Sequence, residues 1–453
     1  MPRRLLHLVV AGALLVGCAA PPASSSTPSP SAPSTTAEPI SPQTPDPTAT
    51  PDAGNVELAM ADAPRAEASP DDARAATAGI NALGFDLLRL IASEQENAVI
   101  SPASISIALG MARAGARGIT AAEMDAVMRD IGAPESAAWL NALDQALASR
   151  SGSFKDGSGE THDLTLRIAN APFSQRGMPL EEAYLTALAE AYGAGVRLVD
   201  YRSDPDGSRR LINAWVDEQT EHRIEELLPE DSVGALTRLI LVNAIYLKAP
   251  WLIPFAEEAT ADGVFTRADG STVDVSMMSA AHHMAYAAGA GWQAVDLPYV
   301  GDKLSMLLIL PDDPTEFTST LDPSQLDAIV GALAPVRVEL SMPKFGIETQ
   351  AELKPLLSAL GMPTAFDANA ADFSGITTAE RLHISAVIHQ ANIDVDEAGT
   401  EAAAATAVIA ELTGGPPPET IELRFDHPFL FALRDIESGA VLFLGAVGDP
   451  SSN

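Results

Sequence analysis

Apolar residues recur along most of this chain with one of two periods, and each period predicts a different element. Apolar residues that recur every three or four positions predict helices over 73–94, 104–114 and 212–228. Almost unbroken apolar runs are typical of strands buried on both faces, and they occur at 238–247 (RLILVNAIYL), 303–311, 337–342 and 441–447. Residues 390–396 alternate polar and apolar side chains, as a half-buried strand does, and 423–433 is again strand-like.

The order of these elements indicates the fold class and the domain plan. Helices crowd the first half and strands the second, which predicts an α+β fold with mixed or antiparallel sheets. Residues 68–450 contain no repeat and no low-complexity break, so we expect one large domain there. Residues 19–67 are rich in Pro, Ser, Thr and Ala. We expect a disordered tether, because such a stretch buries too little surface to offset its ordering entropy.

The N-terminus has the form of an export signal. A basic start is followed by an apolar run to Val16, and Leu15–Cys18 resembles the box of bacterial lipoproteins, in which the cysteine is lipidated. Residues 1–18 are therefore expected to be a lipoprotein signal peptide, although an ordinary signal with a chance cysteine is the alternative. Lipid on Cys18 would hold the exported protein on the outer side of the bacterial cytoplasmic membrane or on the cell surface, unless it is released outside the cell. With Cys18 so used, no disulfide braces the fold.

Charge and motifs exclude several function classes. The chain has 27 basic and 61 acidic residues and a formal charge of −34, which disfavours nucleic acid as a partner. No dense basic cluster signals a heparin-like ligand. The sequence contains no G-x-S-x-G, no H-E-x-x-H and no phosphate-binding glycine loop, so we expect neither enzyme activity nor a metal or cofactor.

A long connection between the strands at 390–396 and 423–433 is the most informative segment, because loops of this length in compact domains are usually functional. A helix over 400–412 is one interpretation, since the stretch is rich in alanine and Gly414-Gly415-Pro416 would stop it, but it lacks a broad apolar stripe. As a strand, the stretch places small or neutral side chains on one face and its two charged residues, Glu401 and Glu411, on the other. That uncharged face suits entry into the middle of a sheet, where an unpaired charge costs several kcal/mol.

Motifs in this segment and elsewhere resemble those of one family. Glu397–Thr406 (EAGTEAAAAT) resembles the hinge of inhibitory serpins, and Phe425–Phe431 (FDHPFLF) resembles their C-terminal signature. Further matches follow in the family's order: 97–104 (NAVISPAS), 213–216 with Thr220 and Ile224, 242–255, 342–345 and 361–375. The chain is identified as a member of the serpin family. The resemblance implies three β-sheets, eight to nine helices and an exposed reactive-centre loop.

The resemblance also implies a function. A serpin acts as a suicide substrate: a serine protease cuts its loop, and the cut loop inserts into the central sheet while the acyl-enzyme still joins the two proteins. We expect a monomer that traps proteases in this way. A non-inhibitory carrier with the same fold and an inhibitor of papain-like cysteine proteases are the alternatives.

Three groups of site residues follow from the family's motifs. The hinge is Glu397, Gly399, Thr400, Glu401, Ala402, Ala403, Ala404 and Ala405, with no evident basic partner for Glu397. The region where the sheet opens is Ser101, Ser104, Asn243, His389 and Trp251. His389 alone would be a satisfied core histidine, and Trp251 is either a gate or plain core. The family's register places the cleaved bond at Thr413–Gly414, with Leu412–Thr413 as the rival, which suits elastase-like or subtilisin-like targets.

Overall fold

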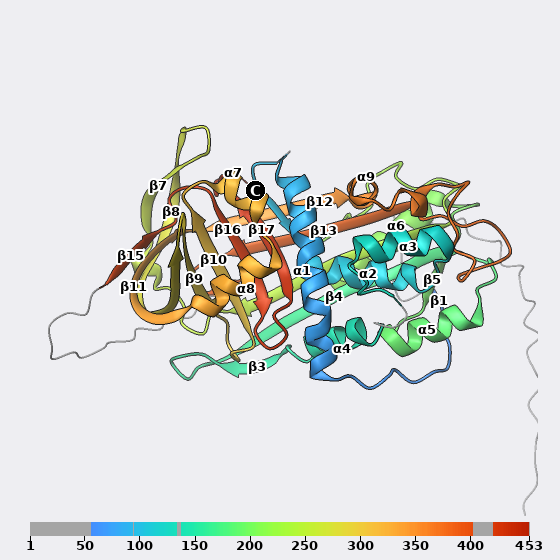
Figure 1. Cartoon of the computed structure of the whole chain (residues 1–453), viewed down its shortest axis with the longest axis horizontal. Helices are drawn as coiled ribbons and strands as arrows, with labels where there is room; N and C mark the ends of the chain where they lie inside the picture. The colour runs from blue at the N-terminus through green and yellow to red at the C-terminus, as the bar shows by residue number, and fades with distance from the viewer. Residues whose placement is uncertain (1–55, 94, 134–136, 402–419, 453) are drawn as a thin grey trace, which may run out of the picture. The chain divides into compact units, whose positions relative to one another are not determined.

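The computed structural model describes residues 56–93, 95–133, 137–401 and 420–452 (Figure 1). Several predicted features lie outside these residues: the signal peptide with Cys18, residues 19–55 of the tether, the hinge alanines Ala402–Ala405, the bond Thr413–Gly414 and its rival at Leu412. The rest of the hinge and the whole sheet-opening region lie within them.

Several helices of the described residues begin at a capping side chain followed by proline. The bounds of the helices are α1 (Pro70–Ala92), α2 (Pro102–Arg113), α3 (Gly118–Val127), α4 (Ala137–Ala148), α5 (Glu182–Tyr192), α6 (Pro205–Gln219), α7 (Pro314–Thr320), α8 (Pro323–Ala332) and α9 (Leu353–Leu360). By contrast, α3, α5 and α9 have no side-chain cap. Proline opens α1 and α2, and the side chains of Ser69 and Ser101 accept backbone N–H groups of the first turn. Proline at this position sacrifices no helical hydrogen bond, so these starts are fixed locally.

Helix α6 ends earlier than the periodicity predicted. The expected helix ran to residue 228, but the chain leaves the helix after Gln219, so the prediction is wrong for residues 220–228. Glu221 and His222 have φ of 52° and 64°, which turns the backbone out of the helix. The Thr220 hydroxyl then accepts the amide of Ile224 at 3.1 Å and keeps the apolar residues that follow against the sheet.

The strands of the described residues are β1 (Glu57–Ala59), β2 (Ala98–Ile100), β3 (Gly152–Lys155), β4 (Thr161–Gln175), β5 (Val196–Val199), β6 (Leu239–Pro250), β7 (Ala261–Thr266), β8 (Thr272–Gly289), β9 (Trp292–Pro298), β10 (Leu304–Pro311), β11 (Ala334–Pro343), β12 (Phe345–Glu352), β13 (Ala386–Val395), β14 (Gly399–Thr400), β15 (Ile421–Arg424), β16 (Phe429–Asp435) and β17 (Val441–Val447). Hydrogen bonds join them into an eight-stranded and a nine-stranded network, which confirms the α+β class.

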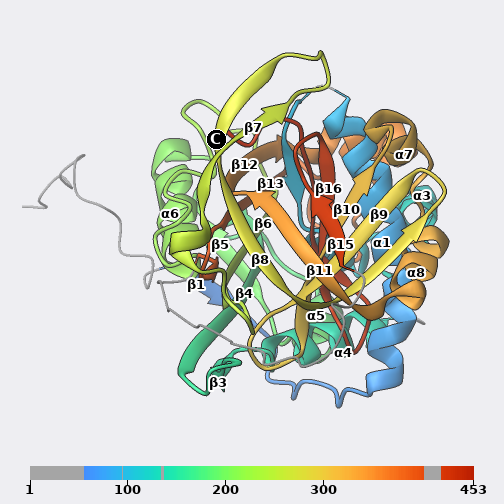
Figure 2. The same ribbon diagram turned by 90° about the vertical axis from the view of Figure 1, so that its left-hand side faces the viewer.

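The eight-stranded network is the central sheet, and it is covered on both faces. Its order is β1-β5-β4-β6-β14-β13-β12, with β3 on β4, so β6 lies in the middle. Alternate residues of β6 pack with α6 on one face, among them Ile240 and Val242. The residues between them face the main core with α1 and α2. Figure 2 shows α6 and α1 on opposite sides of these strands.

The nine-stranded network has the order β15-β11-β8-β9-β10-β16-β17-β2, with β7 on β8. The long strand β8 pairs with β7 near its start and with β9 near its end, and so links two groups of strands. The stretch expected as one strand over 423–433 is two strands, because the chain bends between Arg424 and Phe429, where Pro428 lacks the N–H that a ladder needs.

The folded domain begins before residue 68. Strand β1 pairs antiparallel with β5 at the edge of the central sheet, and Val56 is buried against the α6 side of the sheet. Residues 56–67 were expected in the disordered tether, and that boundary is wrong, since one buried valine and a short ladder are enough to hold them in place.

Candidate functional site

A polar cluster lies in the core directly beneath the middle of the central sheet. Asn243 on β6 stands opposite Asn170 on β4 and opposite His389 on β13. The N-terminus of α2 approaches the same point, where the Ser101 amide donates to Nε2 of His389 at 3.1 Å. β6, β13 and the N-terminus of α2 therefore bring together Asn243, His389 and Ser101, which the family's motifs had placed in one group.

Hydrogen bonds satisfy the buried side chains of this cluster. The amide of Asn243 donates to the Ser104 hydroxyl at 2.5 Å and to Oδ1 of Asn170 at 2.6 Å. Asn170 in turn donates to the carbonyl of Ser104 at 2.9 Å. Sequence reasoning missed Asn170, although its polar side chain shares a face of β4 with Leu166 and Ile168 and could have been noticed as an interruption of that apolar face.

His389 is held neutral by its surroundings. Its ring is fully buried, and Nε2 accepts the Ser101 amide, so Nδ1 carries the proton and donates it to Oδ1 of Asn243. Burial lowers the pKa of His389 to about 3, and the hydrogen bond with Asn243 opposes this only in part. The interpretation as a satisfied core histidine fits this geometry.

We expect acid to destabilise the intact protein through His389. An unfolded chain binds this proton near pH 6.5, whereas the folded chain binds it only near pH 3. Because the folded pKa is depressed, the contribution is complete above pH 6.5 and falls by about 1.4 kcal/mol per pH unit below it. Urea unfolding at a series of pH values should show this slope, added to that of the carboxylates.

Two substitutions isolate the contribution of His389. His389→Gln can keep both hydrogen bonds without titrating, so the part of the slope between pH 6.5 and 3 should shrink. His222→Gln is the matched control, since His222 is exposed and its pKa is raised by Asp217 instead. An unchanged slope in His389→Gln would show that the folded protein tolerates a charged ring.

The first residues of the hinge already lie within the sheet. Thr400 pairs with Val395 of β13 on one side and with Ala249 of β6 on the other, antiparallel to both. Further along, β6 and β13 pair directly with each other and are parallel. The end of the sheet is thus a wedge: β14 separates the two strands at its wide end, and the polar cluster lies where they come together.

Gly399 is required by close approach at the mouth of this wedge. A Cβ atom at this position would lie 2.3 Å from the carbonyl oxygen of Ala249 and 2.7 Å from Cα of Pro250. Backbone atoms cannot move aside cheaply, and φ is +153°, which side chains rarely allow. Glycine is therefore required at this hinge position both for its backbone conformation and for lack of space.

Thr400 faces an aromatic pair. Its hydroxyl is 2.6 Å from that of Tyr299, and both side chains are buried. The Tyr299 ring stacks on Trp251 with centroids 4.4 Å apart. Trp251 donates its indole N–H to the carbonyl of Asp396 at 3.0 Å. Trp251 therefore contributes more than core packing, because it is hydrogen-bonded to the residue just before the hinge and supports the tyrosine that Thr400 contacts. Tyr299 was missed as a site residue.

Glu397 has the basic partner that was not evident in the sequence. Lys344, from the segment that joins β11 to β12, places its Nζ 2.6 Å from Glu397, and the Thr260 hydroxyl donates to the same carboxylate at 2.6 Å. Burial by itself would raise the pKa of Glu397, but these hydrogen bonds outweigh it and hold the pKa below the ordinary value. No partner was evident in the sequence because Lys344 is brought to Glu397 only by tertiary folding.

Glu401 marks the point where the described hinge leaves the sheet. Arg223, in the turn after α6, forms ion pairs with Glu401, at 2.9 Å, and with Asp394 of β13. Glu401 has a φ of +51°, a strained value for this residue. Burial raises the pKa of its carboxyl, and Arg223 opposes that shift. Arg223 therefore fastens the hinge to β13 on the face opposite to Thr400, and any further insertion must rearrange this contact.

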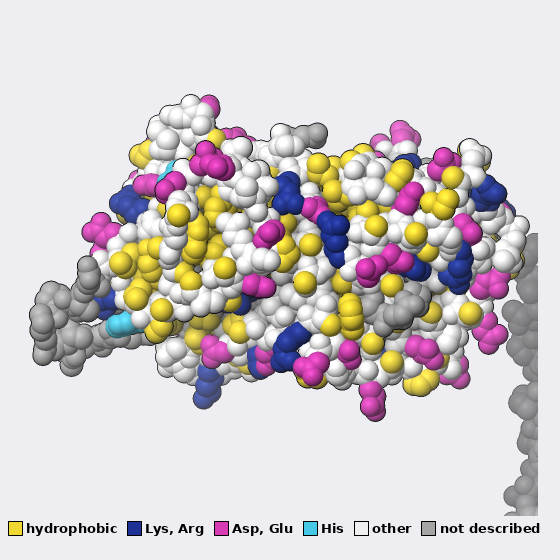
Figure 3. Space-filling view, viewed as in Figure 1, with side chains coloured by type: hydrophobic (Ala, Val, Ile, Leu, Met, Phe, Trp, Pro, Cys, Tyr) yellow, Lys and Arg dark blue, Asp and Glu magenta, His cyan; other side chains and the backbone are white. Residues whose placement is uncertain are grey.

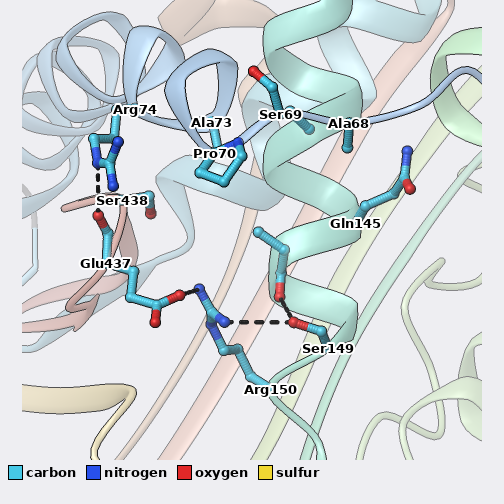
Figure 4. Close-up of a pocket in the computed structure, with 12 residues that line it drawn as sticks. Ala68, Ser69, Pro70, Ala73, Arg74, Gln145, Ser149, Arg150, Glu437 and Ser438 are labelled. Carbon is cyan, nitrogen blue, oxygen red and sulfur yellow. Dashed lines mark hydrogen bonds and ion pairs between the residues drawn. The ribbon is translucent and has the colours of Figure 1, made fainter. Parts of the chain in front are cut away.

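Basic side chains near α1 are mostly neutralised. A cavity of about 300 Å³ lies beside the start of α1 and contains Arg74 and Arg150 (Figure 4). Arg150 pairs with Asp435 at 2.6 Å and with Glu437 at 2.8 Å, while Arg74 pairs with Asp71. On the face shown in Figure 3 basic side chains are scattered among acidic ones. The absence of a heparin-like site stays a prediction, and nothing in this cavity favours an anionic chain.

The arrangement is mechanical in nature. The described residues of the wedge form a neutral slot, a hinge and a network of hydrogen bonds. Both ring nitrogens of His389, the one buried base among them, are hydrogen-bonded. The geometry of these residues leaves room for the hinge to continue as a strand between β6 and β13.

Comparisons with known proteins agree with this geometry. Residues 78–450 match the family model described as Serpin (serine protease inhibitor). A serpin-like protein of Thermococcus kodakarensis is 37% identical over 376 residues, which cover 82% of this chain and 85% of the relative. The Leukocyte elastase inhibitor of Bos taurus is 36% identical, covering 78% and 93%. The crystal structure of native protease nexin-1 with heparin superposes with a TM-score of 0.72 at 29% identity, over 84% of this chain and all of that one. The chain belongs to the serpin family.

Proposed function

We propose that this protein is a suicide inhibitor of serine proteases of the elastase-like or subtilisin-like kind. The observation that carries the proposal is the position of Gly399 and Thr400, which are hydrogen-bonded between β6 and β13 as the first residues of an entering strand would be. A relative that is 36% identical bears the name Leukocyte elastase inhibitor, and this supports the same class of target.

Pairing direction supplies a driving force. Residues 386–391 of β13 and 240–245 of β6 form a parallel ladder, and a strand that continues β14 would run antiparallel to both. Insertion therefore replaces one parallel ladder by two antiparallel ones, which pair slightly better per residue. The intact fold is then stable because a barrier separates it from the inserted form.

The sequence beyond Thr400 fits such a slot. In the register that Thr400 sets, residues 402, 404 and 406 would face the same side, and they are Ala, Ala and Thr. Small neutral side chains can pass beneath the sheet without leaving a charge unpaired. Glu401 would face the α6 side, where Arg223 already meets it.

The chemical steps belong to the protease. Its serine attacks the carbonyl carbon of Thr413, the bond to Gly414 breaks, and the amine of Gly414 leaves with the proton that the protease supplies. The acyl-enzyme ester then joins the two proteins. The freed segment enters the sheet, and the protease is dragged along and distorted before water can hydrolyse the ester.

Mixing the protein with pancreatic elastase or subtilisin tests the proposal. We expect an SDS-stable band at the sum of the two masses, and mass spectrometry of the released C-terminal peptide should begin at Gly414. A protease whose serine has been blocked chemically is the control and should give no such band. If a broad panel of serine and papain-like proteases cuts the loop without forming a complex, a carrier role for the fold is favoured instead.

We also propose that the protein acts as an exported monomer held on a membrane by lipid on Cys18. The motif at residues 15–18 supports the anchor. Cys18→Ser should move the protein from the detergent phase to the aqueous phase in a Triton X-114 partition. If the unchanged protein already partitions into water, the anchor is wrong.

A further inference from the structure

A second cavity lies at the edge of the central sheet, away from the hinge. On the side of β4 facing away from β6, β5 pairs only with Phe173–Gln175, so the stretch before Phe173 leaves a gap beside β5. The gap opens into a cavity of about 240 Å³. Residues of β1, α2, β4, β5 and α6 line it, so segments far apart in the sequence build its walls.

Two polar groups in the walls lack partners within the described part of the chain. The Arg197 guanidinium lies over the Trp215 ring, 4.6 Å from its centroid, and forms no hydrogen bond or ion pair there. Trp215 is 95% buried, and its indole N–H is unsatisfied. Burial lowers the pKa of Arg197, although the attraction of Glu218 opposes it. Trp215 is thus a buried donor without an acceptor, which is uncommon and costly in folded proteins, whereas Arg197 is partly exposed.

The other walls decide what kind of molecule fits. Leu58 and Met60 from the N-terminal segment, with Met111 of α2 and Ile168 of β4, give the cavity an apolar side. Asp144 also lines it but is paired with Arg65 at 2.6 Å, so its charge is matched. What the cavity lacks is an acceptor, preferably anionic, beside Arg197.

We propose that this cavity binds a small amphiphilic carboxylate, such as a short fatty acid, whose carboxylate accepts hydrogen bonds from Arg197 and Trp215 and whose apolar tail packs against Leu58, Met111 and Ile168. The volume admits on the order of eight non-hydrogen atoms at about 30 Å³ each. Hexanoate is of this size.

Binding would reach the polar cluster of the sheet. Asn170 lines the cavity and accepts hydrogen bonds from both Ser104 and Asn243. A ligand that packs against Asn170 binds the closed sheet and should raise the unfolding midpoint of the intact protein in proportion to its occupancy. This readout does not depend on protease inhibition, so the cavity and the proposed function can fail separately.

Isothermal titration of the full chain with hexanoate tests the site. We expect one saturable site, with hexanol and hexylammonium at least tenfold weaker because they lack the anion. Arg197→Gln should weaken hexanoate about tenfold and Arg197→Lys less, since lysine keeps the charge. Arg176→Gln is the matched control: it removes the same charge from the neighbouring exposed pair with Glu57 and should leave binding unchanged.

Three results would overturn the proposal. They are no saturable binding of hexanoate, equal binding of hexylammonium, and unchanged hexanoate affinity in an Arg197→Gln variant whose unfolding midpoint matches that of the unchanged protein. If Arg197→Gln does not fold, Trp215→Phe replaces it, since it removes the indole donor together with part of the ring under Arg197 and should also weaken hexanoate; unchanged affinity there contradicts the site equally.

Discussion

Subtilisin and elastase should cut the Thr400→Arg variant as a simple substrate, and the variant should form a stable covalent complex with neither protease. Thr400 is 1% exposed and faces Tyr299 and Trp251 in the slot between β6 and β13. A guanidinium there has no acidic partner within the described slot, and burying it costs several kcal/mol. Since about 1.4 kcal/mol in a barrier is a tenfold change in rate, insertion should slow at least a hundredfold and lose the race against hydrolysis.

Densitometry of the SDS-stable band against the cleaved band measures this change directly. Thr400→Ser keeps the hydroxyl that meets Tyr299 and should inhibit as the unchanged protein does. Glu422→Arg adds the same side chain at an exposed position of β15 and should also leave the complex intact. Undiminished complex formation by Thr400→Arg would mean that the slot is not where the cut segment goes.

The second large effect is expected from Asn243→Ala, which should lower the free energy of unfolding by about 3 kcal/mol. Asn243 is fully buried and contacts Ser104, Asn170 and His389. Its removal leaves the Nδ1–H of His389 without an acceptor and takes one of the two donors from the Oδ1 of Asn170, which keeps Ser104; an unsatisfied buried group costs about 1–3 kcal/mol. β6 and β13 should then separate more easily, so the variant should also lose its ability to form the protease complex faster on warming.

Urea unfolding followed by circular dichroism checks the stability change. Asn392→Ala is the matched control, because Asn392 lies on β13 but points away from the cluster and makes two long hydrogen bonds, with the carbonyl of Arg223 and with the side chain of Gln390, each at 3.4 Å. It should change stability by no more than about 0.5 kcal/mol. If the two variants unfold at the same midpoint, the cluster does not hold the sheet closed.

Local pattern was sufficient to predict two strands of the central sheet, β6 and most of β13, whereas β4, β5 and β12 were not predicted. Asn243 and His389 were grouped by the family's motifs, and the structure places them opposite each other on these two strands. The hinge glycine could be predicted for the same reason, since its neighbours form a recognisable motif. Where the signal was local and strong, the structure agrees.

Contacts that depend on register between distant segments could not be predicted. Lys344 reaches Glu397, and Arg223 reaches Glu401, only after strands and turns far apart in sequence have packed. Tyr299 carries no local sign of its role, and the only sign for Asn170 is that it interrupts the apolar face of β4. The end of α6 was missed because residues 220–228 keep an apolar pattern while the backbone turns at Glu221. A pattern reports which residues are buried more reliably than the backbone conformation that buries them.

Thermal unfolding of the intact protein, compared with that of the same protein cut once within residues 412–414, tests the central claim most directly. If the severed segment enters the sheet between β6 and β13, the cut protein gains two antiparallel ladders, and its midpoint should rise by on the order of 10 °C or more. A cut protein that melts at or below the temperature of the intact one would contradict insertion.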